Sequence, residues 1–289
     1  MKANNSPVRR WCVMVALLAT SACEKVVNIT VPEGAKQLVV EGRLERVRGA
    51  VTGQQRIRLT TTDAYFSNTA LPPARGASVR VVEEGGRVVS FGEVVNEPGV
   101  YATADLIAVV NRRYTLQIIY QNERYEATEV LRAVPPIDSL YFKDRIGQLG
   151  PQEGLRATID FRDLAGTQNF YLWDQFVNGQ RLTAADSTFR TRVVAPDDGL
   201  DGRPISQFQP YDGIPVSKGA SVLVRQMSLS EPVYRFYRAL SDQSSNDGSP
   251  FAVPLASVRG NVSNLTNAAH RPLGYFMATE VAEARAVAP

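Results

Sequence analysis

Hydrophobic and polar residues alternate along much of the chain from Gln37 onward. In Arg56-Ile57-Arg58-Leu59-Thr60 every second residue is apolar, as expected for a strand with one buried face. Turn-forming residues such as Glu84-Gly85-Gly86-Arg87 and Asn178-Gly179 separate runs of this kind. The pattern predicts strands in the first half of the chain over residues 38–44, 56–61, 78–83, 88–91, 99–102, 114–120 and 125–130.

Two consecutive prolines, Pro135 and Pro136, divide the chain into two β-rich parts. Proline fixes φ and lacks a backbone N–H, so neither a helix nor a central strand continues through the pair. The first part contains only short predicted strands and no predicted helix. This pattern predicts an immunoglobulin-like or prealbumin-like β-sandwich over residues 37–133. The second β-rich domain, residues 134–289, is predicted to contain strands over residues 139–143, 155–161, 170–177, 188–194, 221–228 and 273–279.

One segment of the second domain has helical periodicity. Four apolar residues are spaced i, i+3, i+4 and i+7 and share one helix face: Val233, Phe236, Tyr237 and Leu240. Ser230 is a suitable N-cap, and Glu231 and Pro232 suit the first turn. The spacing predicts one short amphipathic helix near residues 231–243, so the expected fold class is mainly β.

The N-terminus combines a basic start, a short apolar run over residues 11–19 and small residues before Cys23. This order is typical of a secretory signal peptide, and the run is shorter than the roughly 20 apolar residues that span a bilayer. Ala22-Cys23 resembles the bacterial lipobox, in which the cysteine is acylated. We therefore predict a signal peptide over residues 1–22, lipidation at Cys23 and a tether over residues 23–36. An ordinary signal peptide that leaves a free thiol is the alternative.

Charge and cysteine content exclude several classes of protein. The chain has 32 basic and 29 acidic residues, and Lys2, Arg9 and Arg10 would leave with the signal peptide, so the mature chain is neutral. A neutral chain has no general attraction to nucleic acid. With one histidine and two cysteines, a thiolate-rich zinc site and a disulfide framework are both excluded. We expect no cofactor.

Two groups of residues are weak candidates for a binding site. Asp197, Asp198 and Asp201 lie in a glycine-containing loop that matches a calcium-binding loop only in part, and a solvated turn is the other interpretation. Tyr171 and Trp173 lie on one face of a predicted strand, where aromatic rings either stack on a ligand or pack in the core. We predict no metal site and leave the ligand-binding residues open.

Catalytic residues are harder to identify. Asp160 and Asp163 are close in sequence, and paired carboxylates can hydrolyse glycosides. His270 is the only histidine, and the chain contains no G-x-S-x-G motif that would mark a serine hydrolase. The sequence therefore favours a non-enzymatic protein, and a carbohydrate- or peptide-directed hydrolase is the low-ranked alternative.

Several segments together resemble a known family, domain of unknown function 4249. The segments are Cys23-Glu24-Lys25, Leu38-Val39-Val40-Glu41-Gly42, Pro135-Pro136-Ile137-Asp138, Phe236-Tyr237-Arg238-Ala239-Leu240, Gly260-Asn261-Val262-Ser263-Asn264 and Leu273-Gly274-Tyr275-Phe276. The family consists of Gram-negative outer-membrane lipoproteins that often accompany TonB-dependent transporters. The resemblance implies a lipid-anchored protein of the outer membrane, on either face, and it supplies no catalytic residues.

Two functions agree with these observations. The first is a binding or accessory component of a TonB-dependent nutrient uptake complex. The second is a structural or adhesion component of the cell envelope. The accessory role agrees with a lipid tether, two β-rich domains and the absence of a catalytic motif. A sandwich with no net charge agrees equally with the accessory role and the adhesion role.

Overall fold

The computed structural model of the chain describes residues 35–64, 69–145, 154–182, 193–244 and 258–289. The predicted signal peptide and Cys23 lie outside these residues, as do most of the tether and most of the strand predicted over residues 188–194. Residues 35–289 form a unit of their own, and the fold is described for this unit.

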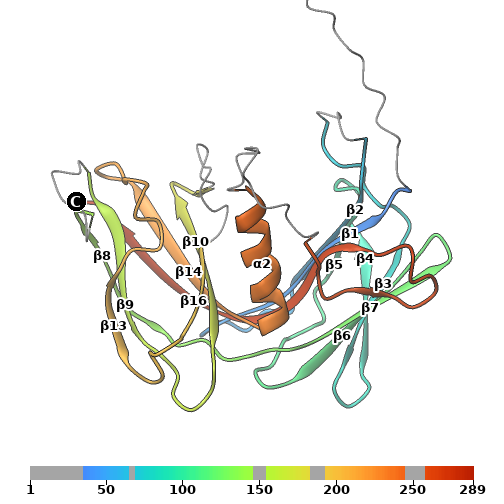
Figure 1. Cartoon of the computed structure of the whole chain (residues 1–289), viewed down its shortest axis with the longest axis horizontal. Coiled ribbons are helices and arrows are strands. Elements are labelled where there is room, and N and C mark those ends of the chain that lie inside the picture. The colour runs from blue at the N-terminus through green and yellow to red at the C-terminus, as the bar shows by residue number, and fades with distance from the viewer. Residues whose placement is uncertain (1–34, 65–68, 146–153, 183–192, 245–257) are drawn as a thin grey trace, which may run out of the picture. The chain divides into compact units, whose positions relative to one another are not determined.

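About half of the described residues lie in strands, and one helix lies in the last third of the chain (Figure 1). The first strands are β1 (Leu38–Val47), β2 (Gln55–Thr61), β3 (Ser78–Glu83), β4 (Val88–Glu93), β5 (Val100–Thr103), β6 (Arg113–Tyr120), β7 (Glu123–Val130) and β8 (Ile137–Lys143). They are followed by β9 (Arg156–Arg162), β10 (Phe170–Val177), β11 (Gln180–Arg181), β12 (Val193–Pro196), β13 (Pro204–Phe208), β14 (Ser221–Leu229), α2 (Glu231–Ser244), β15 (Ser263–Asn264) and β16 (Leu273–Val287).

The predicted fold class is confirmed at this level: within the described residues the protein is mainly β, with one helix. β3 and β10 have the predicted bounds, and α2 extends one residue beyond residue 243. The short strands β11, β13 and β15 were not predicted, and β16 continues to Val287 instead of ending at residue 279.

The strands form one large mixed sheet and one small sheet. The large sheet has the order β11-β10-β14-β16-β1-β2-β5-β4-β3-β6-β7-β15, and β12 also pairs with β10. The small sheet has the order β13-β9-β8. Among these named strands, neighbours are antiparallel except for β1 and β16, which are parallel.

β16 joins the strands of the two predicted domains into the large sheet. From Leu273 to Val281 it pairs with β1, and from Val281 to Val287 it pairs with β14. Its side chains enter different cores, because Phe276 packs among strands of the first half and Ala282 among strands of the second half. The boundary that we predict at residues 133–134 lies between β7 and β8 and stays a prediction.

Three hydrophobic cores account for the packing. The first includes Leu44, Ile57 and Tyr114, from β1, β2 and β6. The second lies around Phe161 of β9 and Trp173 of β10. The third lies between α2 and the large sheet, where Val233, Phe236, Tyr237 and the partly buried Leu240 contribute the predicted apolar face (Figure 1).

Glycines from two family-like segments meet beside β1. Gly274 has φ +86°, and a Cβ atom on it would lie 2.0 Å from the carbonyl oxygen of Val40. A Cβ atom on Gly260 would lie 1.6 Å from the carbonyl oxygen of Gly274. Asn261 then accepts a hydrogen bond from the Phe276 N–H (2.9 Å) and donates one to the Phe276 carbonyl (2.7 Å). These segments fix the start of β16.

Candidate functional site

Tyr171 and Trp173 lie on the same face of β10, as predicted, and this face packs in the second core. Each is only 2% exposed. Trp173 donates from Nε1 to Oε1 of Gln226 (2.8 Å), and Tyr171 donates from its hydroxyl to the Asp163 carboxylate. Burial and this contact with Asp163 raise the pKa of the Tyr171 hydroxyl. In this structure the two rings are part of the core and offer no open face for stacking.

The three aspartates of the candidate metal loop point to different backbone and side-chain donors. Asp197 accepts from the Asn169 N–H (2.9 Å) and Asp201 from the Gly166 N–H (2.6 Å). Asp198 accepts from a side-chain amide at 3.3 Å. Among the described residues, no group of three or more Asp, Glu, His or Cys side chains could hold a metal ion. The aspartates instead hold the loop of residues 196–202 against residues 166–169.

Asp160 and Asp163 also have separate partners. Asp160 accepts from the Gln207 N–H (2.7 Å) and from two side-chain hydroxyls, and these bonds lower its pKa although burial opposes the change. Asp163 accepts from the Gly202 N–H (3.0 Å) and from Tyr171. Each carboxylate is thus already engaged with fixed donors inside the fold.

His270 contacts a carboxylate at the surface. Its Nδ1 lies 2.6 Å from Oε1 of Glu123, and its side chain is 50% exposed. Tyr125 and His270 together lower the pKa of Glu123. Asn264 contacts the same glutamate (2.8 Å) and the His270 carbonyl (2.9 Å). The arrangement ties the loop before β16 to β7.

A groove that the sequence did not predict lies on the face of the large sheet that carries α2. Its first part, here the charged compartment, has a volume of about 290 Å³ and is formed by β1, β2, β11, β16 and the turn before β5. The residues that define it are Glu41, Arg43, Arg56, Arg58, Glu97, Arg181 and Tyr275. Four arginines therefore face two glutamates.

The second part of the groove, here the aromatic compartment, has a volume of about 450 Å³. It lies between α2 and the starts of β1 and β16, and it is defined by Val39, Phe236, Tyr237, Leu240, Val258 and Tyr275. The three aromatic rings pack together, with centroids 5.1 to 5.5 Å apart. Glu41 and Tyr275 line both compartments, so the two compartments are adjacent.

Arg43 is held at the boundary between the compartments. Its Nε donates to the Tyr275 hydroxyl (2.9 Å), and one Nη donates to the Tyr237 hydroxyl (3.4 Å). The other Nη lies 3.5 Å from Glu45 and 3.8 Å from the buried Asp174. Because side chains on two sides fix the guanidinium group, Arg43 is a rigid positive charge next to the aromatic rings.

The other charged groups of the groove divide into paired and unpaired ones. Arg56 forms an ion pair with Glu97, and Arg181 contacts Asp174 at 2.6 Å. Arg58 and Glu41 occupy facing positions on β2 and β1, and both are exposed. Neither forms an ion pair within the described part of the chain. Arg58 is therefore the guanidinium group of the groove that is available for a ligand.

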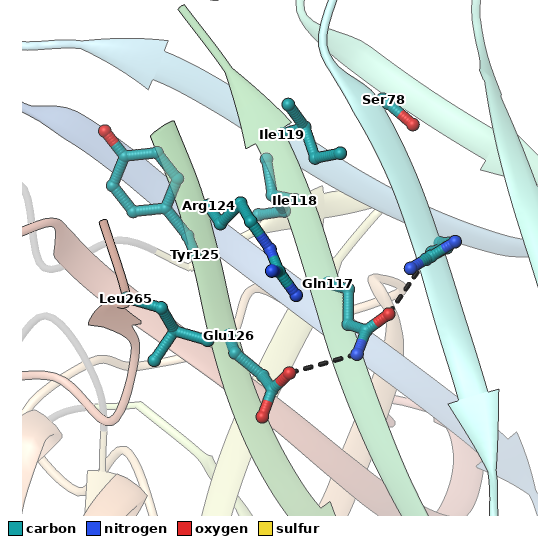
Figure 2. A pocket seen from close by; sticks show the side chains of 9 residues that line it. Ser78, Gln117, Ile118, Ile119, Arg124, Tyr125, Glu126 and Leu265 are labelled. Atoms are coloured by element: carbon teal, nitrogen blue, oxygen red, sulfur yellow. Dashed lines mark hydrogen bonds between the residues drawn. The ribbon is translucent and has the colours of Figure 1, made fainter. Parts of the chain in front are cut away.

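A second, much smaller pocket lies on the far strands of the large sheet, around β3, β6 and β7. Figure 2 shows Gln117 hydrogen-bonded to Glu126, and Gln117 also accepts from Arg80. The volume is about 20 Å³, which holds about one water molecule. This pocket is too small for a ligand. Its Arg124 is an exposed arginine outside the groove, so it can serve as a control for substitutions of Arg58.

The sequence indicates the charged residues of the groove but not their aromatic neighbours. Glu41 and Arg43 alternate with buried residues along β1, and Arg56 and Arg58 do the same along β2. The alternation places all four on one face, but it does not show that Tyr275 lies beside them. No helix among the described residues is long and apolar enough to cross a membrane.

Comparisons with known proteins match one family model and several solved structures, among them two distant ones. An α-L-rhamnosidase of Aspergillus terreus is 12% identical, with a TM-score of 0.25 over 68% of this chain and 27% of that chain. A DUF4785 family protein of Legionella pneumophila is 11% identical, with a TM-score of 0.22 over 66% and 52%. The chain thus spans about a quarter of the first protein and about half of the second. At TM-scores this low, neither structure supports a conclusion about the fold or the function of this chain.

A search of curated proteins finds no match. A family model described as a domain of unknown function, DUF4249, matches residues 24–285. This match covers nearly the whole chain and confirms the resemblance seen in the sequence. The chain belongs to the DUF4249 family.

Proposed function

We propose that this protein is a lipoprotein of the outer membrane, anchored through Cys23, and a non-enzymatic binding component of a TonB-dependent nutrient uptake complex. The observation that carries the proposal is the N-terminal order of basic residues, apolar run and Ala22-Cys23. The family match begins at residue 24, directly after this cysteine, which agrees with a cleaved and lipidated start.

The groove supports a binding role. Ligand sites in proteins are concave and largely apolar, with a few polar groups that fix orientation. The aromatic compartment supplies the apolar part, and the adjacent charged compartment supplies polar groups. Asp160 and Asp163, the carboxylates considered for catalysis, accept hydrogen bonds from backbone N–H groups elsewhere in the fold. We also propose that β1–β7 form an immunoglobulin-like or prealbumin-like sandwich around the first core.

The test is a purification of the tagged protein from outer membranes in mild detergent, followed by mass spectrometry of the proteins that accompany it. A Cys23→Ala variant serves as the unanchored control. The proposal predicts acyl chains on Cys23 and a TonB-dependent transporter in stoichiometric amount with the wild type, reduced in the control. A lipidated protein that purifies alone contradicts the uptake complex and favours the adhesion role, and an unmodified Cys23 contradicts the anchor.

A further inference from the structure

Four arginines and two glutamates line the charged compartment, and Arg43 and Arg181 are balanced by Glu45 and Asp174 behind the lining. The Arg56–Glu97 pair is exposed on both sides, with side chains 56% and 48% exposed. Exposed ion pairs contribute little stability, so a ligand can open this pair at small cost. Arg58 has no ion-pair partner within the described residues, and a guanidinium group binds a carboxylate or phosphate through two parallel hydrogen bonds.

The aromatic compartment is preformed. Phe236, Tyr237 and Tyr275 are only 8%, 3% and 6% exposed and belong to the third core, so they form the fixed back of the compartment rather than an open stacking face. Leu240 and Val39 complete an apolar wall that continues from these rings. A rigid wall of this kind favours an apolar or aromatic group, because little side-chain ordering is needed when it binds.

We infer that the groove binds an amphipathic anion, with its carboxylate group on Arg58 and its apolar part in the aromatic compartment. Arg43 adds a fixed positive charge where the two compartments meet. Glu41 lies at the same boundary and disfavours a second negative charge there. The groove therefore selects a small monoanion with one apolar end. This inference rests on the proposed binding role and is independent of the membrane anchor and the transporter.

The test uses isothermal titration calorimetry of the full chain with three matched probes. 4-Phenylbutyrate has both features, 4-phenylbutanol lacks the charge, and butyrate lacks the ring. We expect 4-phenylbutyrate to bind at least about tenfold more tightly than either single-feature probe. A hydrogen-bonded charge contributes about this factor relative to 4-phenylbutanol, and burial of the phenyl ring contributes about this factor relative to butyrate.

Three variants locate the site. Arg58→Gln is expected to weaken 4-phenylbutyrate about tenfold and to leave 4-phenylbutanol unchanged. Arg124→Gln, on the exposed arginine of the small pocket in Figure 2, is the matched control and should change neither affinity. Glu41→Gln should strengthen the binding of 4-phenylbutyrate, because it removes a like charge. Both arginines and Glu41 are exposed, so all three variants keep the fold.

The inference is overturned if 4-phenylbutyrate binds no more tightly than 4-phenylbutanol, or if Arg58→Gln behaves like Arg124→Gln. A loss of affinity on Glu41→Gln also overturns it, because it indicates a zwitterionic or cationic ligand. These outcomes are separable from those of the purification. If the protein binds the anion but purifies alone, the inference about the groove stands and the uptake complex is contradicted. If it purifies with a transporter but binds no probe, the uptake complex is supported and the inference about the groove is overturned.

Discussion

Two buried glutamines on neighbouring strands allow a sharp test of the hydrogen-bonding pattern. Gln175 of β10 is 1% exposed, and neither its Oε1 nor its Nε2 has a hydrogen-bond partner among the residues that the structure describes. Gln226 of β14 is fully buried, but it accepts from the indole N–H of Trp173 (2.8 Å) and donates to the Pro135 carbonyl (3.1 Å). The same substitution should therefore have opposite effects at the two positions.

Gln175→Met replaces an unpartnered amide by an apolar side chain of similar length. The change removes a desolvation penalty, so the free energy of unfolding should rise by about 1 to 2 kcal/mol. Gln226→Met removes two hydrogen bonds and leaves a buried indole N–H and a buried carbonyl without partners. That loss should lower the free energy of unfolding by about 2 to 4 kcal/mol.

The assay is urea unfolding at equilibrium, followed by far-UV circular dichroism and tryptophan fluorescence, with coincident transitions as the check on two-state behaviour. Equal m-values for the wild type and both variants would show that the same surface is exposed on unfolding. The reasoning is refuted if Gln175→Met destabilises the protein as much as Gln226→Met does, because Gln175 would then have partners comparable to those of Gln226.

Further predictions concern the start of β16 and a buried carboxyl group. Gly274→Ala should lower the free energy of unfolding by at least about 2 kcal/mol, because Gly274 has a positive φ and an added Cβ atom would lie 2.0 Å from the Val40 carbonyl oxygen. Gly85 also has a positive φ, but no atom lies within 4 Å of an added Cβ. Gly85→Ala should therefore lower the free energy of unfolding by less than half as much in the same urea assay. Burial raises the pKa of Glu129 from 4.5 to about 7, against hydrogen bonds from Ser230 and Asn261. The folded state then binds more protons than the unfolded state between these pH values, so stability from this group is lost as pH rises through the window. Glu129→Gln should gain up to about 3 kcal/mol relative to wild type between pH 4 and pH 8, and a constant difference over this range would contradict the assignment.

Local patterns were sufficient for most strands and for the helix. β10 has the predicted bounds because its aromatic and β-branched composition agrees with its position in the sheet. The apolar face of α2 packs in the third core as its spacing indicates. Ser230 precedes α2 as predicted, and its hydroxyl donates to Glu129 (2.9 Å), a contact that depends on a residue 101 positions earlier in the chain.

The second half of β16 could not be predicted from its own residues. Residues 280–287 are rich in alanine and include glutamate and arginine, which favour helix over strand. Pairing with β14 from Ser221 to Met227 overrides this preference. Context of this kind is absent from the local sequence, because the pairing joins segments about 60 residues apart in the chain.

The groove depends on the same long-range pairing. Tyr275 reaches Arg43 because β16 pairs in parallel with β1, and Tyr237 reaches Arg43 because α2 packs over β16. The sequence shows the arginines of β1 and β2 and the aromatic residues of α2 and β16, but it does not show that they lie side by side. Since the groove forms only in the folded sheet, its ligand should bind the native state alone and raise the melting temperature with concentration. Gly274→Ala, which disturbs the start of β16, should then reduce this rise as well as the stability, whereas Gly85→Ala should leave the rise unchanged.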